Sequence, residues 1–151
     1  MMTPSRSSNL PMKVLLRLGA QIDRQLPPGL DVLPRVDVDL GLAIRREVRV
    51  PDLVVLPTNL MRRGPNRASE IVLTIEILTP GLRDQDIIDT RVEYADAGIP
   101  SLWIVNPRTP VTATVYGLYC GDFEEDQRCE RTLKVDKPCR LTIDLDTLLP
   151  C

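Results

Sequence analysis

Apolar and polar positions in the first third of the chain follow two different periods. In residues 11–26 the apolar side chains recur every three or four positions, the spacing of one helical face, and the Pro-Pro-Gly at residues 27–29 ends the pattern. In residues 30–44 apolar residues alternate with charged and turn residues. This second pattern predicts one or two strands after the helix.

Two apolar runs occupy the centre of the chain. Residues 48–56 are rich in β-branched side chains but contain Pro51, which suits the start of a strand better than a paired central position. Residues 71–78 are almost continuously apolar, as expected for a strand covered on both faces. The loop between them, residues 57–67, holds a tight cationic cluster: Arg62, Arg63 and Arg67.

A second helix is predicted over residues 83–97. Acidic residues stand in its first turn, and Gly98 follows its end. Its apolar stripe, formed by Ile88, Val92 and Ala95, is expected to face the core.

The last third of the chain is predicted to be mostly strands. Residues 102–105 form a short buried strand, and further strands are expected at 111–119, 130–135 and 140–145, with a polar acidic loop at 121–127. The order of elements indicates one α/β (α+β) domain over residues 11–151, built around a mixed sheet, after a disordered N-terminus at residues 1–10.

Composition narrows the chemistry that this domain can perform. The net charge of −2 argues against nucleic-acid binding through bulk charge, so a polyanion site would have to be local. The absence of histidine excludes Ser-His-Asp and Cys-His catalysis as well as imidazole metal sites. Sixteen of the 19 cationic residues are arginines, and the three lysines are Lys13, Lys134 and Lys137.

Cysteines and hydropathy indicate the compartment. Cys120, Cys129, Cys139 and Cys151 lack the close pairs of a zinc site and are expected to be reduced or inert thiols. The N-terminus has no apolar signal core, and no apolar run approaches the length of a membrane span. We therefore expect a cytoplasmic protein.

Two carboxylates stand within or beside the central apolar runs. Asp52 precedes Leu53, and Glu76 lies between Ile75 and Ile77. Burying an unpaired charge there would cost several kcal/mol, so each acid needs a cation, a hydrogen-bond network or an exposed strand end. Carboxylates that hold Mg²⁺ can support phosphodiester hydrolysis without histidine, and the Ile77 carbonyl would supply a third oxygen ligand.

The order of several short motifs identifies a family resemblance. The motifs are Pro51-Asp52, Glu76-Ile77-Leu78-Thr79-Pro80, Asp86, Tyr94-Ala95-Asp96-Ala97-Gly98-Ile99-Pro100 and Trp103-Ile104-Val105-Asn106-Pro107. In this order they resemble the Uma-type putative restriction endonuclease family of the PD-(D/E)xK nuclease superfamily, over roughly residues 12–150. The resemblance implies a restriction-endonuclease-like mixed central β-sheet flanked by helices, with Asp52 and Glu76 as metal ligands.

The chain departs from the family pattern at two places. The superfamily lysine two positions after the acid falls on Leu78, and the helix lysine that the family places four residues before Tyr94 falls on Thr90. Arg91, beside Thr90, is the expected substitute, because it lies on the predicted inward stripe of the helix. The family's opening segment, which carries a further acidic site residue, is also expected to be missing.

Several candidate residues have a structural interpretation as well. Asp52 could be a turn residue at the start of a strand, Glu76 could form a buried pair with an arginine such as Arg91, and Asp86 could cap its helix. Tyr94 and Trp103 are expected to be core residues, and the arginine cluster is expected to be solvated.

These observations lead to one main function and two alternatives. The main prediction is a Mg²⁺-dependent (or Mn²⁺-dependent) DNA endonuclease, with Asp52, Glu76 and Arg91 as catalytic residues and Asp52, Glu76 and the Ile77 carbonyl as metal ligands. The alternatives are a degenerate nuclease fold that acts as a nucleic-acid-binding or regulatory module, and a structural partner protein with neither activity. DNA is the expected partner, and we expect no contact with a membrane. A homodimer is plausible because a double-strand cut needs two sites, but nothing in the sequence shows one.

Overall fold

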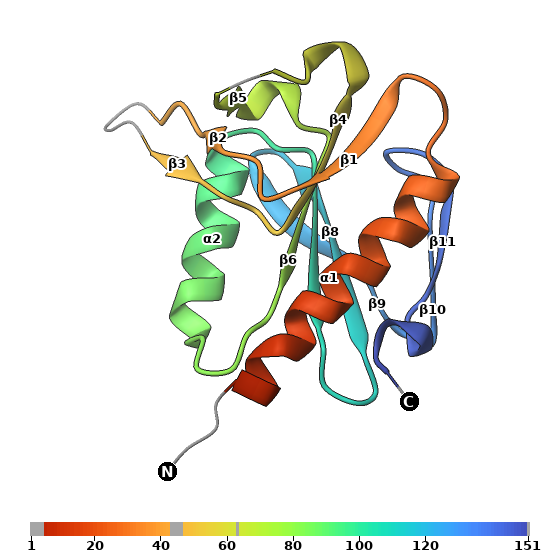
Figure 1. Ribbon diagram of the computed structural model, residues 1–151. Helices are drawn as coiled ribbons and strands as arrows, with labels where there is room; N and C mark the ends of the chain where they lie inside the picture. Colours follow the sequence, from red (N-terminus) through yellow and green to blue (C-terminus); the bar gives the residue numbers. More distant parts are fainter. Residues whose placement is uncertain (1–4, 43–46, 63, 151) are drawn as a thin grey trace.

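A six-stranded mixed sheet forms the centre of the molecule (Figure 1). The computed structural model describes residues 5–42, 47–62 and 64–150. In spatial order the strands are β1 (Leu30–Pro34), β4 (Leu53–Pro57), β6 (Leu73–Ile77), β7 (Ser101–Asn106), β8 (Thr112–Tyr119) and β9 (Asp122–Glu130). Neighbouring strands are antiparallel except β6 and β7, so the predicted mixed sheet is confirmed.

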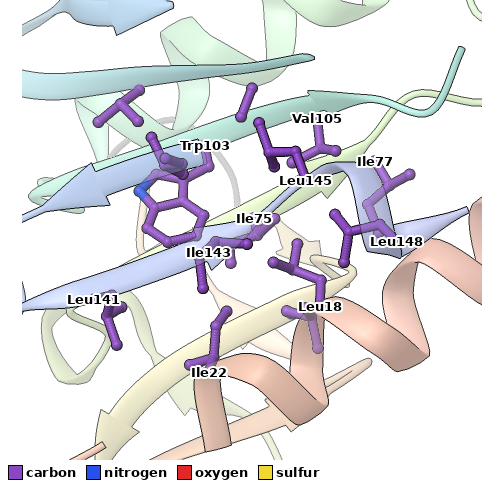
Figure 2. Packing of buried hydrophobic residues seen from close by; sticks show 14 of the residues in the cluster. Leu18, Ile22, Ile75, Ile77, Trp103, Val105, Leu141, Ile143, Leu145 and Leu148 are labelled. Atoms are coloured by element: carbon purple, nitrogen blue, oxygen red, sulfur yellow. The ribbon is translucent and has the colours of Figure 1, made fainter. Parts of the chain in front are cut away.

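One face of the sheet is covered by the helix α1 (Ser5–Gln25) and by a hairpin of β10 (Thr132–Val135) and β11 (Leu141–Asp144). The helix buries Val14, Leu18 and Ile22 completely, as its apolar spacing predicts. Figure 2 shows Leu18 and Ile22 packed against Ile143 and the sheet residue Ile75. This cluster is the larger part of the hydrophobic core.

The opposite face is covered by the helix α2 (Asp84–Asp96), which lies across the sheet from α1 in Figure 1. The helix connects the two parallel strands β6 and β7, the crossover that parallel pairing requires. The apolar residues of β6, Leu73, Ile75 and Ile77, all belong to the larger cluster, and the flanking Ile71 and Leu78 belong to the second. Both faces of the strand are covered as predicted, although the residue that β6 buries on the α2 side is Thr74. A small sheet of β2 (Val38–Asp39), β3 (Val48–Arg49) and β5 (Asn66–Arg67) lies beside this second cluster. Short 3-10 turns at Thr58–Leu60, Ala68–Glu70 and Asp146–Leu148 complete the described elements.

The first helix begins earlier than its sequence pattern indicates. It starts at Ser5 and runs through Pro11, so the prediction of a disordered segment up to residue 10 is wrong for residues 5–10, whereas residues 1–4 lie outside the described part. Pro11 is buried, and contacts within the fold compensate for its unfavourable place in a helix. Because proline usually marks the start of a helix, the sequence pattern placed the helix start at Pro11 and not at Ser5.

The predicted acidic loop at residues 121–127 is also wrong. Residues 122–127 belong to the edge strand β9, which pairs with β8 apart from one irregularity between Val115 and Tyr116. Cys120 and Gly121 both have positive φ, at 52° and 85°, and form the two-residue turn that joins the strands. The acids point outward along an exposed edge, where charged side chains are compatible with a strand.

The apolar stripe predicted for α2 is wrong for two of its three residues. Ile88 and Val92 are about half exposed, whereas the third, Ala95, is buried together with Tyr94. The helix is rotated so that the large Tyr94 ring, rather than the smaller aliphatic residues, packs against the sheet. No helix among the described residues is long and apolar enough to cross a membrane.

The described cysteines are unpaired. Cys120, Cys129 and Cys139 have free thiols, in agreement with the expectation of reduced residues, and Cys151 lies outside the described part.

Candidate active site

Asp52 stands at the point where pairing between β4 and β6 ends. The ladder runs from Val55–Leu73 to Leu53–Ile75 and would continue to Pro51 and Ile77, but proline has no N–H to donate. The Asp52 carboxylate instead accepts a hydrogen bond from the Ile77 N–H, at 2.7 Å. Asp52 is therefore held against the end of β6 by the strand's own backbone.

The same arrangement leaves one main-chain oxygen without a ladder donor. The N–H and C=O of a strand residue point to the same side, so the Ile77 carbonyl faces the Pro51–Asp52 segment as its N–H does. Pro51 cannot donate to it. An oxygen ligand is thus available beside Asp52.

Arg35 forms an ion pair with Asp52. Its guanidinium lies 3.2 Å from the Asp52 carboxylate, and its main-chain N–H donates to the Asp52 carbonyl, also at 3.2 Å. Arg35 is 65% exposed and Asp52 is 18% exposed, so this pair faces solvent on the arginine side. It stabilises the position of Asp52 more than it stabilises the fold.

Glu76 projects from the other face of β6, toward α2. The Tyr94 hydroxyl donates a hydrogen bond of 2.5 Å to its carboxylate. Burial, and after it the nearby negative charge of Asp52, raises the pKa of Glu76 to about 7, against the opposing effect of the Tyr94 hydrogen bond. Burial and the Glu76 charge likewise raise the pKa of Tyr94 above its usual value, so Tyr94 stays a donor. A like-charged neighbour and a buried carboxylate are conditions that a bound cation would relieve.

A hollow of about 360 Å³ opens beside Glu76, between the end of β6 and α2. It is lined by Thr90 and Asp86 of the helix and by Arg49 at the end of β3, among others. Arg49 also forms an ion pair with Glu93 and lies 3.6 Å from Glu47. Among the described residues that line this hollow, Arg49 is the cation.

Arg91 is not brought to the acids, which corrects the expectation that it would replace the missing lysine. Its guanidinium lies 4.5 Å from the centre of the Tyr116 ring and lines a separate hollow near Phe123. Successive helix residues are rotated by about 100°, so the face that carries Thr90 and Tyr94 toward Glu76 turns Arg91 away. The alternative of a buried pair between Glu76 and Arg91 is wrong for the same reason.

Thr90 occupies the position that the family resemblance reserves for lysine. It lines the hollow beside Glu76, and its hydroxyl donates to the Asp86 carbonyl of the preceding turn at 2.9 Å. The position where the resemblance expects a lysine therefore lies beside Glu76, and its residue carries no charge.

The remaining candidate residues have structural roles, and one of them, Asp86, also lines the hollow. Asp86 caps α2, accepting hydrogen bonds from the Arg83 N–H and guanidinium, and it also lines the hollow. Arg62 pairs with Glu70 near the surface, and Arg63 lies outside the described residues. Trp103 is fully buried, as expected.

Sequence reasoning missed three site residues: Tyr94 as a hydrogen-bond donor, Arg35 and Arg49. A signal existed only for Tyr94, which lies one helical turn after Thr90 and so shares its face. Arg35, just after β1, and Arg49, at the end of β3, reach the site through strand pairings that the sequence does not reveal.

The donor set suits a small, hard cation. Asp52, Glu76 and the Ile77 carbonyl offer only oxygen, and a cation with few protein ligands that keeps several waters is typical of Mg²⁺. Among residues 5–42, 47–62 and 64–150, no group of three or more Asp, Glu, Cys or His side chains could hold a metal ion. The oxygen donors that this site would offer to such a cation are the two carboxylates and the Ile77 carbonyl.

The mixed sheet with helices on both faces defines a restriction-endonuclease-like fold. A crystal structure described as a putative nuclease belonging to DUF820, from Anabaena variabilis, has this fold: its TM-score is 0.62 at 19% sequence identity, over 99% of this chain and 84% of that one. The chain belongs to the Uma2 family, described as "Putative restriction endonuclease", whose model matches residues 1–141. No curated protein matches the chain.

Proposed function

We propose that this protein is a divalent-metal-dependent DNA endonuclease. Membership of a family described as restriction endonucleases supports the nuclease class. The finer proposal rests on the arrangement around Ile77. The Asp52 carboxylate accepts a hydrogen bond from the Ile77 N–H, and the buried Glu76 carboxylate projects from the preceding residue of β6.

Asp52, Glu76 and the Ile77 carbonyl would hold Mg²⁺ or Mn²⁺. When bound, such a cation neutralises charge on phosphoryl oxygens and activates water. Tyr94 fixes the Glu76 carboxylate through its hydroxyl, and Arg35 and the Ile77 N–H fix Asp52. Both acids are thus oriented before any ligand arrives, which lowers the cost of ordering them.

Arg49 takes the place that the sequence assigned to Arg91. It lines the same hollow as Glu76, and its charge acts on Glu76. A guanidinium stays protonated, so it can neutralise a phosphate but is a poor proton donor. The assignment predicts electrostatic stabilisation without proton transfer from this side chain.

Plasmid nicking tests this function. Purified protein with Mg²⁺ or Mn²⁺ should convert supercoiled plasmid to the open circle, and Glu76→Ala should abolish the conversion while the circular-dichroism spectrum stays unchanged. Equal inactivity of the wild type and the variant would remove the catalytic claim.

Thr90 favours a second candidate, a nuclease fold that binds DNA without cutting it. The lysine position of the family lines the site but carries an uncharged residue whose hydroxyl bonds to its own helix. Calorimetry separates the two functions: salt-sensitive DNA binding without Mg²⁺ or Mn²⁺ binding supports the binding module. Metal binding at Asp52 and Glu76 with DNA nicking supports the endonuclease.

A further inference from the structure

A second, larger hollow lies on the Asp52 side of the site. Its volume is about 780 Å³, and it is lined by Met12, Leu15 and Leu16 of α1 together with Ile77 and Asp52. Ile77 lines both this hollow and the smaller one beside Glu76, so the two meet at the end of β6.

The helix presents large apolar side chains to this hollow. Met12 is 68% exposed and Leu16 is 64% exposed, one helical turn apart on the same face. Their burial would release about 25 cal/mol per Å² of apolar surface, so an apolar ligand surface would be favoured there. Methionine adapts well to flat aromatic ligands.

Cations border this apolar surface. Lys13, one of three lysines in the chain, and Arg35 both line the hollow, and Asn9 and Thr79 add uncharged polar groups. Asp52 is the acid among the lining residues. The smaller hollow differs in character, because its lining includes the acids Glu76, Asp86 and Asp89 with Arg49.

A nucleotide divides in the same way, into a charged phosphate and a flat base with apolar faces. We infer that the hollow beside α1 receives an unpaired nucleobase of the strand whose phosphate lies at Asp52 and Glu76. The substrate class is therefore DNA with an unpaired base next to the cleavage position. This inference rests on the proposed nuclease function.

Fully paired DNA cannot supply this ligand, because both faces of each base are stacked inside the duplex. Base faces become available in single strands, or when one base leaves the duplex at an energetic cost. The lysine and arginine at the rim would then contact the flanking phosphates. A base of a single strand and a base that has left the duplex would both present the same flat apolar face to Met12 and Leu16.

Binding measured by fluorescence anisotropy tests the inference apart from catalysis. The probes are a labelled 12-nucleotide DNA strand, its fully paired duplex, and the duplex with one bulged base, with Ca²⁺ in place of Mg²⁺ and at constant ionic strength. The single strand should bind about tenfold more tightly than the paired duplex, a difference typical of one well-contacted base. Tight binding of the bulged duplex identifies an extrahelical base as a source, and weak binding restricts the source to single strands.

Two matched variants locate the binding surface. Leu16→Gln should weaken single-strand binding about fivefold by removing apolar contact, whereas Ile88→Gln changes an apolar residue on α2 that is also exposed, at 47%, and should leave the binding unchanged. Both variants are at the surface, and equal melting temperatures would confirm intact folding. Equal affinity for all three probes, equal effects of the two variants, or no binding to any probe would overturn the inference.

The outcome is separable from that of the proposed function. A preference for unpaired DNA that depends on Leu16, without cleavage of any DNA, would overturn the catalytic proposal and support the base site. Cleavage of fully paired DNA with no effect of Leu16→Gln would support the catalytic proposal and overturn the base site.

Discussion

The Asp52 carboxylate accepts a hydrogen bond from the main-chain N–H of Ile77, at a distance of 2.7 Å. Pro51 interrupts the ladder at this point, and the aspartate side chain satisfies the strand in place of a backbone carbonyl. One contact therefore completes the end of β6 and also positions a candidate metal ligand next to the strand that carries Glu76. Structure and site depend on the same pair of residues.

Substitutions at Asp52 should separate these two roles. Asp52→Ala leaves the Ile77 N–H without its partner and should lower the free energy of unfolding by about 1–3 kcal/mol. Asp52→Asn retains an acceptor oxygen and should cost less stability, but should lose Mg²⁺ binding as completely as Asp52→Ala. Urea denaturation and calorimetry measure the two effects, and unchanged Mg²⁺ affinity in Asp52→Asn would contradict the metal assignment.

Thr90→Lys should increase nicking activity. The position faces the hollow beside Glu76, so a lysine there would place an ammonium next to the acids. We expect at least a tenfold higher rate in the plasmid assay, in the range that a positioned acid or charge contributes. Ile88→Lys, which adds the same charge to the exposed side of α2, is the control and should give no gain.

Arg49 and Arg91 should respond in opposite ways to replacement by alanine. Arg49→Ala removes the cation that lines the hollow and should reduce nicking at least tenfold, as expected for the loss of one charged group that stabilises a transition state. Arg91→Ala removes a guanidinium from the Tyr116 ring and should lower the free energy of unfolding by about 1 kcal/mol without affecting the rate. Loss of activity in Arg91→Ala at unchanged stability would restore the sequence-based assignment.

The stability of the metal-free protein should fall as the pH rises from about 4.5 to 7. Glu76 has a pKa of about 7 in the folded state and an ordinary value of 4.5. In this interval the unfolded chain has lost the Glu76 proton and the folded chain still holds it, so stabilisation present below pH 4.5 is lost by pH 7. The difference amounts to about 3 kcal/mol.

Chemical denaturation in EDTA across this pH range measures the effect against Glu76→Gln, which cannot titrate. The wild type should lose stability relative to the variant over the interval, and the difference between them should be constant above pH 8. Parallel pH profiles for the two proteins would show that Glu76 has an ordinary pKa.

The sequence located the strands that carry the site with good accuracy. Residues 71–78 are apolar because Leu73, Ile75 and Ile77 pack into the larger cluster while Ile71 and Leu78 pack into the second, and this property is local enough to be visible in the sequence. Pro51 likewise marks the end of pairing through its own chemistry. The order of the motifs was sufficient to indicate the family and the mixed sheet.

Rotation of α2 could not be obtained from the sequence. Ile88 and Val92 make a plausible apolar stripe, but the space beside the sheet accommodates the Tyr94 ring and leaves the two aliphatic residues exposed. Long-range packing overrides a weak local pattern of this kind, and it moves Arg91 away from the acids.

The sequence by itself determined which residues could do chemistry: a chain without histidine, two acids at apolar runs, and an uncharged residue where the family resemblance implies a lysine. The tertiary structure decided which cations reach those acids. Arg35 follows β1, which pairs with β4, and Arg49 ends β3, which pairs with β2, whereas Arg91 is turned to the other side of its helix. Such placement depends on helix rotation and strand register, which are set by the packing of the whole core and not by neighbouring residues.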